Sequence, residues 1–172
     1  MKRNYIPLLV ALLVILAGCS APVRIYTDIA KSANFEQYNT YNFLDFTEGN
    51  KKTITQMERE RIRVAIAREL EKRGLDFAEK GADVSVQITL YHREARNHFY
   101  GYPGGYNYMQ RAIEVDIYDN RTRNHVWHSA AVGELVYDPG ERAERLPEVA
   151  GKIFRDYPVK PAVQDQDTES AS

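Results

Sequence analysis

Cysteine is almost absent from this chain. Cys19 is the only cysteine in 172 residues, so no disulfide can form within the chain. The fold must therefore depend on a hydrophobic core, and the length suits one domain with a modest core.

Basic charge is not in excess either. The 23 Lys and Arg residues are balanced by 24 Asp and Glu residues, which gives a formal net charge of −1. A domain that binds nucleic acid usually presents a basic face to the phosphates. The charge balance therefore predicts no nucleic-acid partner.

Long hydrophobic runs are also missing. The apolar stretch at residues 6–17 has twelve residues and is interrupted by Pro7. A helix that crosses the hydrocarbon core of a membrane needs about 20 residues. Lys2 and Arg3 precede the stretch, and a short basic segment before a short apolar one is typical of a secretory signal peptide.

The single cysteine follows this stretch directly. Leu16-Ala17-Gly18-Cys19 resembles a lipobox, in which two small residues precede the cysteine whose thiol receives lipid. We predict cleavage before Cys19 and anchoring to a membrane through its acyl chains, each buried CH2 adding about 0.8 kcal/mol. Ser20, rather than Asp, follows the cysteine. This favours the outer membrane of a Gram-negative bacterium, with the domain facing the periplasm.

The whole chain is expected to divide into four segments. Residues 1–18 are the signal peptide, and their removal leaves 21 basic and 24 acidic residues, a formal charge of −3. Residues 19–34 are expected to form a lipidated tether, although the alternation at residues 23–27 also fits an edge strand. Residues 35–158 form a single α+β domain, and residues 159–172 form a disordered acidic tail.

Two amphipathic helices are predicted. Thr55 and Glu58 fit a capping box at the start of the first helix, and Gly74 fits its C-terminal cap. The second helix carries an apolar stripe over residues 146–157, with Pro147 in its first turn and Pro158 after its end. Residues 49–52 between the first strand and the first helix are expected to be a polar loop.

The strands show the alternation of a sheet with one buried face. Residues 83–90 and 113–118 place apolar side chains on one face and polar side chains on the other, and residues 125–137 form a further long strand. Residues 35–44 are aromatic-rich and end as a strand. The fold class is therefore α/β (α+β): a two-layer sandwich with a mostly antiparallel, four- to five-stranded sheet covered on one face by two helices.

Several motifs occur in a familiar order. They are the lipobox, the aromatic segment at residues 34–43, Ala82-Asp83-Val84 at the start of a strand, Val126-Trp127 after a polar turn, and the closing residues 153–158. Together they resemble the bacterial envelope lipoproteins of domain-of-unknown-function family 4136, over about residues 16–158. The resemblance implies an envelope location and a small α+β domain, and it implies no catalytic residue.

The histidines and the potential nucleophiles of the sequence point to no metal site and no catalytic motif, apart from one small histidine site that is left open. His125 and His128 lie three apart on a strand, so we expect them to face opposite sides and not to share a metal. His92 and His98 should lie roughly 20 Å away, which leaves open only a smaller site of His92, Glu94 and His98. No Gly-x-Ser-x-Gly motif is present. We predict no catalytic residue, no metal and no cofactor.

The segment at residues 93–109 is the most unusual one. It is expected to be a long loop that concentrates aromatic residues among glycines, and long loops in compact domains are often functional. Its candidate partner-binding residues are Phe99, Tyr100, Tyr102, Tyr106 and Tyr108. Tyrosines bury a large area at low entropy cost, as in binding loops. A plain hairpin tip without function is the alternative.

The sequence therefore favours a non-enzymatic envelope module that binds a protein, glycan or lipid partner, or that supports the envelope. Two alternatives are left open: an enzyme acting on a periplasmic substrate, and a carrier of a metal or small ligand. A closed cleft with a perturbed acid or base would favour the enzyme.

Overall fold

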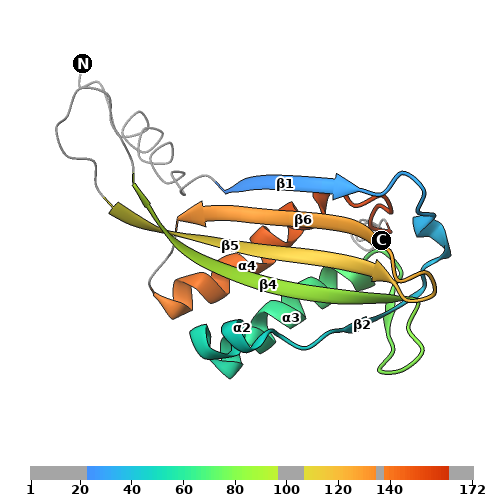
Figure 1. Ribbon diagram of the computed structural model, residues 1–172, viewed down its shortest axis with the longest axis horizontal. Coiled ribbons are helices and arrows are strands. Elements are labelled where there is room, and N and C mark those ends of the chain that lie inside the picture. Colours follow the sequence, from blue (N-terminus) through green and yellow to red (C-terminus); the bar gives the residue numbers. More distant parts are fainter. Residues whose placement is uncertain (1–22, 97–106, 135–137, 163–172) are drawn as a thin grey trace, which may run out of the picture.

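A computed structural model describes residues 23–96, 107–134 and 138–162 of the chain. They form a six-stranded sheet with the strand order β1-β6-β5-β4-β2-β3 (Figure 1). The predicted two-layer α+β sandwich is correct in its layers, but the sheet has six strands rather than four or five.

Antiparallel pairing builds the larger part of the sheet. It joins β1 (Arg24–Ile29), β6 (His125–Glu134), β5 (Asn107–Asp119) and β4 (Val84–Arg96). On the other side of β4, β2 (Thr40–Phe43) pairs parallel with β4 and also with the short β3 (Asp76–Phe77). The parallel part arises because a helix separates β2 from β4, and such a crossover returns the chain in the same direction.

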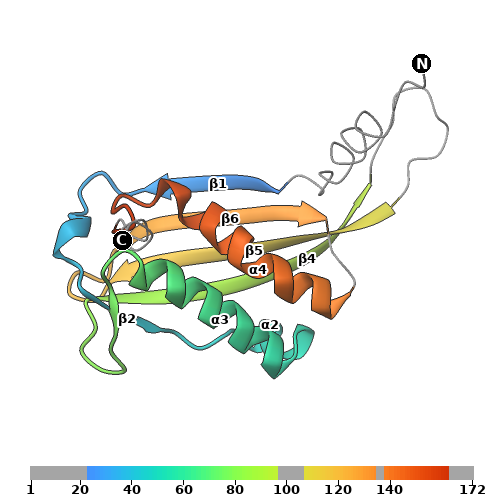
Figure 2. The same ribbon diagram turned by 180° about the vertical axis from the view of Figure 1, so that it is seen from behind.

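Three α-helices complete the layer on one face. They are α2 (Glu48–Thr53), α3 (Gln56–Glu71) and α4 (Pro139–Ile153), accompanied by the 3-10 helices η2 (Phe35–Gln37) and η3 (Phe154–Asp156). Figures 1 and 2 show α3 and α4 side by side on one face of the sheet, while no described helix covers the other face. None of the described helices is both long and apolar enough to cross a membrane.

The capping signals of α3 are confirmed. The Thr55 side chain accepts a hydrogen bond from the Glu58 N–H at 3.2 Å, and Gly74 after the helix has a positive φ of 82°. A residue with a side chain rarely adopts such a φ, so glycine suits this position.

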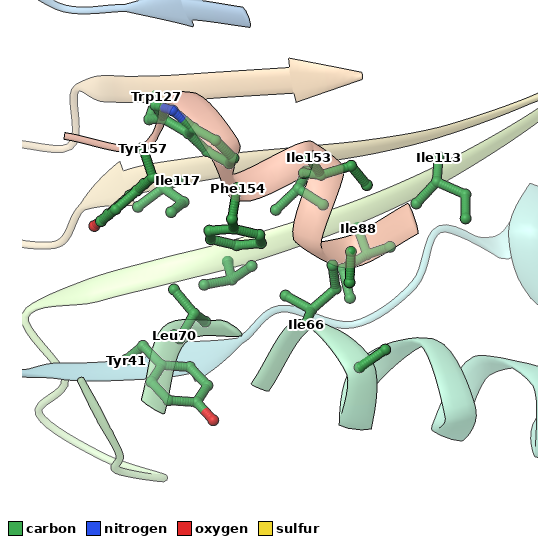
Figure 3. Close-up of a cluster of buried hydrophobic side chains, with 14 of the residues drawn as sticks. Tyr41, Ile66, Leu70, Ile88, Ile113, Ile117, Trp127, Ile153, Phe154 and Tyr157 are labelled. Atoms are coloured by element: carbon green, nitrogen blue, oxygen red, sulfur yellow. The ribbon is translucent and has the colours of Figure 1, made fainter. Parts of the chain in front are cut away.

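The core lies between the helices and the sheet. The apolar face of the central strands contributes Val86, Ile88 and Ile117, which are at most 2% exposed. Ile66 and Leu70 of α3 and Ile153 of α4 pack on them in the same cluster (Figure 3).

Four expected elements differ from the structure. Residues 24–29 form the edge strand β1, so the sheet begins before residue 35 and inside the expected tether. The expected polar loop at residues 49–52 lies in α2. There the Asn50 side chain exchanges two hydrogen bonds with the Leu90 backbone, at 2.7 and 3.1 Å, on the β4 edge beyond the end of β2.

Helix α4 is the third difference and the β4–β5 connection is the fourth. Helix α4 begins at Pro139 behind the cap of Asp138, so Pro147, which was expected in the first turn, lies inside the helix. Proline suits the first turn because its missing N–H would have no helical partner there. Strand pairing continues to Arg96 and resumes at Asn107, so the ends of the expected loop at residues 93–109 are strand.

The aromatic segment at residues 34–43 belongs largely to the core. Phe35 packs edge-on against both Tyr38 and Tyr157, with ring centroids 5.9 and 5.4 Å apart. Asp83 holds the start of β2, because its Oδ2 accepts hydrogen bonds from the N–H groups of Asn39 and Thr40, both at 2.9 Å. These contacts explain why the aromatic segment and the Ala82-Asp83-Val84 motif occur together.

A substitution at Ile66 tests which face of α3 packs on the core. It is 1% exposed at the middle of α3, so Ile66→Asp would bury an unpaired carboxylate. We expect a loss of more than about 3 kcal/mol in the free energy of unfolding, measured by urea denaturation. Val64→Asp is the matched control, because Val64 is 41% exposed on the same helix. It should cost about 0.5 kcal/mol. Equal losses would contradict the packing described here.

Asp119 gives the fold a defined acid sensitivity. The backbone N–H of Thr122, with the Tyr38 hydroxyl and the Arg121 N–H, holds the pKa of the Asp119 carboxyl below its usual value against the opposing effect of burial. A lowered folded-state pKa stabilises the protein above the unfolded value of about 3.9, and this contribution is lost as the pH falls through the folded value.

We therefore expect Asp119→Asn to destabilise the fold at pH 7 by about 1–3 kcal/mol. The difference from wild type should shrink as the pH is lowered below about 4. Thermal melting between pH 3 and 7 measures it. Asp156→Asn is the control, because Asp156 is exposed at the end of η3, and it should match wild type throughout. A difference for Asp119→Asn that stays constant with pH would contradict this role of its charge.

Candidate functional site

An apolar groove lies between α3, α4 and one end of the sheet. Its cavity volume is about 260 Å³. This is below the 300–1,000 Å³ usual for pockets that bind drug-sized ligands, so the groove suits one slender apolar group. Its apolar lining consists of Val23, Met57, Ile113, Ala131, Leu146 and Val149, with Pro139 and Ala143 at the α4 wall.

Small residues create the groove. Ala131 and Gly133 of β6 form its floor, and Ala143 lies on the α4 wall. Further along α4, Ala150 and Ile153 are at most 3% exposed and pack closely on the core. The two helices are therefore anchored near their C-terminal ends, while the N-terminal half of α4 leaves space above the sheet.

Charged side chains line one part of this groove. Glu58 Oε1 lies 2.7 Å from an Arg111 terminal nitrogen and 3.2 Å from Arg142 Nε. The three side chains are between 11% and 21% exposed, so the contacts are poorly screened by water. Arg61 and Arg145 also line the groove. Four arginines and one glutamate give its lining a net positive charge.

A family model matches residues 25–159, which span β1 to the segment after η3. Its description is a domain of unknown function, DUF4136. The chain belongs to the DUF4136 family. The predicted resemblance is thus confirmed over most of the sequence. No curated protein is significantly similar in sequence to this DUF4136 chain.

Several solved structures are similar to this chain at low sequence identity, and one with a TM-score above 0.5 shows a related fold. A PDZ domain protein from Parabacteroides distasonis is 15% identical, with a TM-score of 0.55 over 83% of this chain. The matched region is only 38% of that longer protein. The PelC dodecamer from Paraburkholderia phytofirmans is 12% identical, with a TM-score of 0.47, and covers 77% of this chain and 96% of the PelC chain. A minor lipoprotein from Acinetobacter baumannii has a TM-score of 0.40 at 11% identity, over 69% of this chain and 91% of its own.

Most of the predicted site residues lie outside the described part of the DUF4136 chain. These are Cys19, Phe99, Tyr100, Tyr102 and Tyr106. Tyr108 lies in β5, where its backbone pairs with Ala95. The partner-binding role of these aromatic residues stays a prediction.

The prediction for the histidine pair was wrong. The β5–β6 register shifts by one residue beside Ile117, so that Trp127 pairs with Ile117 and His125 with Tyr118. Val126 is the inserted residue, and it is buried together with Trp127. This β-bulge interrupts the two-residue alternation and brings His125 to the open face that also carries His128.

Both imidazoles converge on one carboxylate. His128 Nδ1 lies 2.7 Å and His125 Nε2 lies 2.9 Å from Asp116 Oδ1. The ring of Tyr118 stacks on His125 with centroids 4.8 Å apart, which fixes the orientation of that imidazole. The open face, expected to be merely polar, thus carries an organised cluster.

The sequence contains weak signals for both sites. Val126-Trp127 is a pair of adjacent large apolar residues near the start of the strand, which is compatible with a bulge there. Ala131, Gly133 and Ala143 are small residues in elements that face each other. The second signal could not be used without the tertiary arrangement, because small residues are common in tightly packed helices and strands as well.

Proposed function

We propose that this DUF4136 chain is a lipid-anchored envelope lipoprotein whose domain binds an amphiphile with one apolar chain and an anionic head. In this proposal Cys19 carries the lipid, the domain faces the periplasm from the outer membrane, and the activity is not enzymatic. The observation that carries the ligand class is the apolar groove with its four arginines.

The position of the groove supports the proposal. Arg24 lies five residues after Cys19 in the sequence. It is aligned in one row across the sheet with Val132 of β6, Ala112 of β5 and Tyr91 of β4. Ile113 and Ala131 of the groove lie one residue from this row. The groove therefore lies at the end of the sheet that carries Arg24. In this proposal that end is nearest the membrane surface, because only five residues along the chain separate Arg24 from the lipidated Cys19.

The β4–β5 hairpin extends beyond the same end. β4 continues from Tyr91 to Arg96, a further distance of roughly 17 Å. Figure 1 shows the two strands projecting past the ends of β1 and β6. In the sequence, the aromatic residues at 99–108 fall between the end of β4 and the first residues of β5. Tyrosines suit the polar–apolar boundary of a membrane. We propose that they contact the membrane or the partner beside the groove.

A binding role is favoured over catalysis by the location of the perturbed groups. Burial raises the pKa of Tyr41 to about 12, and backbone N–H groups lower the pKa of Asp83. Neither residue lines the groove, and Asp83 instead holds the start of β2. An enzyme usually places such shifted groups in its cleft. An enzyme acting on a periplasmic substrate is therefore the weaker alternative.

The anchor is tested by Cys19→Ser. We expect this variant to lose membrane association while keeping its folded domain, because acyl chains supply the anchoring and residues 24–162 supply the core. Fractionation of cells should recover it in the soluble periplasmic fraction, and its melting temperature should equal that of wild type. Sedimentation of Cys19→Ser with the outer membrane after a salt wash would contradict lipid anchoring.

The groove is tested with two amphiphiles of the same chain length and opposite charge. We expect the full-length protein to bind decanoate and to bind decyltrimethylammonium at least tenfold more weakly, a difference of about 1.4 kcal/mol. Titration calorimetry below the micellar concentration measures both. Ala143→Trp should fill the groove and abolish decanoate binding.

Lys80→Trp is the control for this experiment. Lys80 is exposed in the turn before β4, at the other end of the sheet, so the added indole should leave decanoate affinity unchanged. Equal affinity for the two amphiphiles would contradict the role of the arginines. Decanoate binding that persists in Ala143→Trp would remove the groove as the site.

A further inference from the structure

We propose that Asp116, His125 and His128 form a binding site for a divalent transition-metal ion, of which Zn²⁺ is the best match. Each residue offers one ligand atom, and the three atoms lie within 4.8 Å of one another on the open face of the sheet. The site is separate from the groove, which lies on the helical side of the sheet and is lined in β5 by Arg111 and Ile113.

The distances are close to those of a metal site. Two ligand atoms on one tetrahedral Zn²⁺ are separated by about 3.4 Å, since each lies roughly 2.0–2.2 Å from the ion. The two imidazole nitrogens are now 2.7 and 2.9 Å from Asp116 Oδ1. Admission of the ion would lengthen these two separations by roughly half an ångström and would bring the two imidazole nitrogens, which lie within 4.8 Å of each other, to about 3.4 Å. His125 Nε2 would also give up its 3.0 Å contact with the Trp127 carbonyl oxygen.

The surrounding residues position the ligands. Asp116 and His128 are directly paired across β5 and β6, so a rigid part of the sheet holds both. Stacking on Tyr118 holds His125. The side chains of His125, His128 and Asp116 are 44%, 31% and 15% exposed, so an ion can reach them from solvent.

Negative charge around the site favours a cation. Asp28 of β1 is the neighbour of His128 on the other side, and Glu114 lies two residues before Asp116 on the same face. A bound divalent ion would reduce the repulsion between these carboxylates.

The donor set selects the class of metal. Imidazole nitrogens suit Zn²⁺, Cu²⁺ and Ni²⁺, whereas Mg²⁺ and Ca²⁺ prefer oxygen ligands. Three protein ligands leave a coordination position open, as in sites where the ion also holds water or another molecule. The ligands must be deprotonated, so zinc binding should weaken as the pH is lowered.

Zinc titration of the full-length, lipid-anchored protein in detergent tests the proposal. We expect one Zn²⁺ per chain at pH 7 by calorimetry, a rise in melting temperature with added ZnCl2, and no comparable binding of Mg²⁺. His125→Gln, His128→Gln and Asp116→Asn should each reduce zinc affinity by more than the 10- to 100-fold that loss of an outer-shell contact typically costs.

His92→Gln is the matched control. The His92 backbone pairs with Arg111, seven residues and roughly 24 Å along β5 from Tyr118. This variant should bind zinc as wild type does. Absence of zinc binding in wild type would overturn the proposal. So would undiminished binding in the His125→Gln and His128→Gln variants, or equal binding of Mg²⁺, which would indicate general attraction to the acidic face.

Discussion

The stacking of Trp127 on Phe154 is the contact on which the remaining structure depends. The two rings lie 5.0 Å apart and nearly parallel, and Tyr157 packs edge-on against Trp127 at 5.3 Å. Arg73, which follows α3, donates a hydrogen bond to the Phe154 carbonyl oxygen at 2.9 Å and also pairs with Glu69 at 2.8 Å. Strand β6 and the C-terminal ends of α3 and α4 thus meet at one place.

This arrangement explains why the two ends of the domain differ. At the end with the aromatic cluster, large rings fill the space between the sheet and the helices, and Phe154 and Tyr157 are fully buried. At the other end the facing positions are Ala131, Gly133 and Ala143, and the space between them is the groove. The closely packed end stabilises the fold, and the loosely packed end is left for a ligand. The groove therefore costs the fold little stability.

Local signals predicted the elements that are determined by neighbouring residues. The capping box at Thr55, the terminal Gly74 and the alternation along β4 identified α3 and the central strands correctly. The parallel pairing of β2 with β4 and the two-residue β3 could not be predicted, because they depend on where the α3 crossover places β2. The groove escaped prediction for the same reason: its small residues come from different elements. The aromatic residues at 99–106 were identified only by composition.

The bulge at Val126 acts on β6 as a frameshift acts on a coding sequence. Residues from Trp127 onward follow one alternation, and His125 belongs to the other, since one residue has been inserted between the two frames. Substitutions can change the chemistry of either histidine, but they leave the frame intact. An insertion or deletion in this short stretch, in contrast, would move His125 across the sheet without altering its identity. The meeting of the two imidazoles is thus encoded in the spacing of the chain as well as in its residue types.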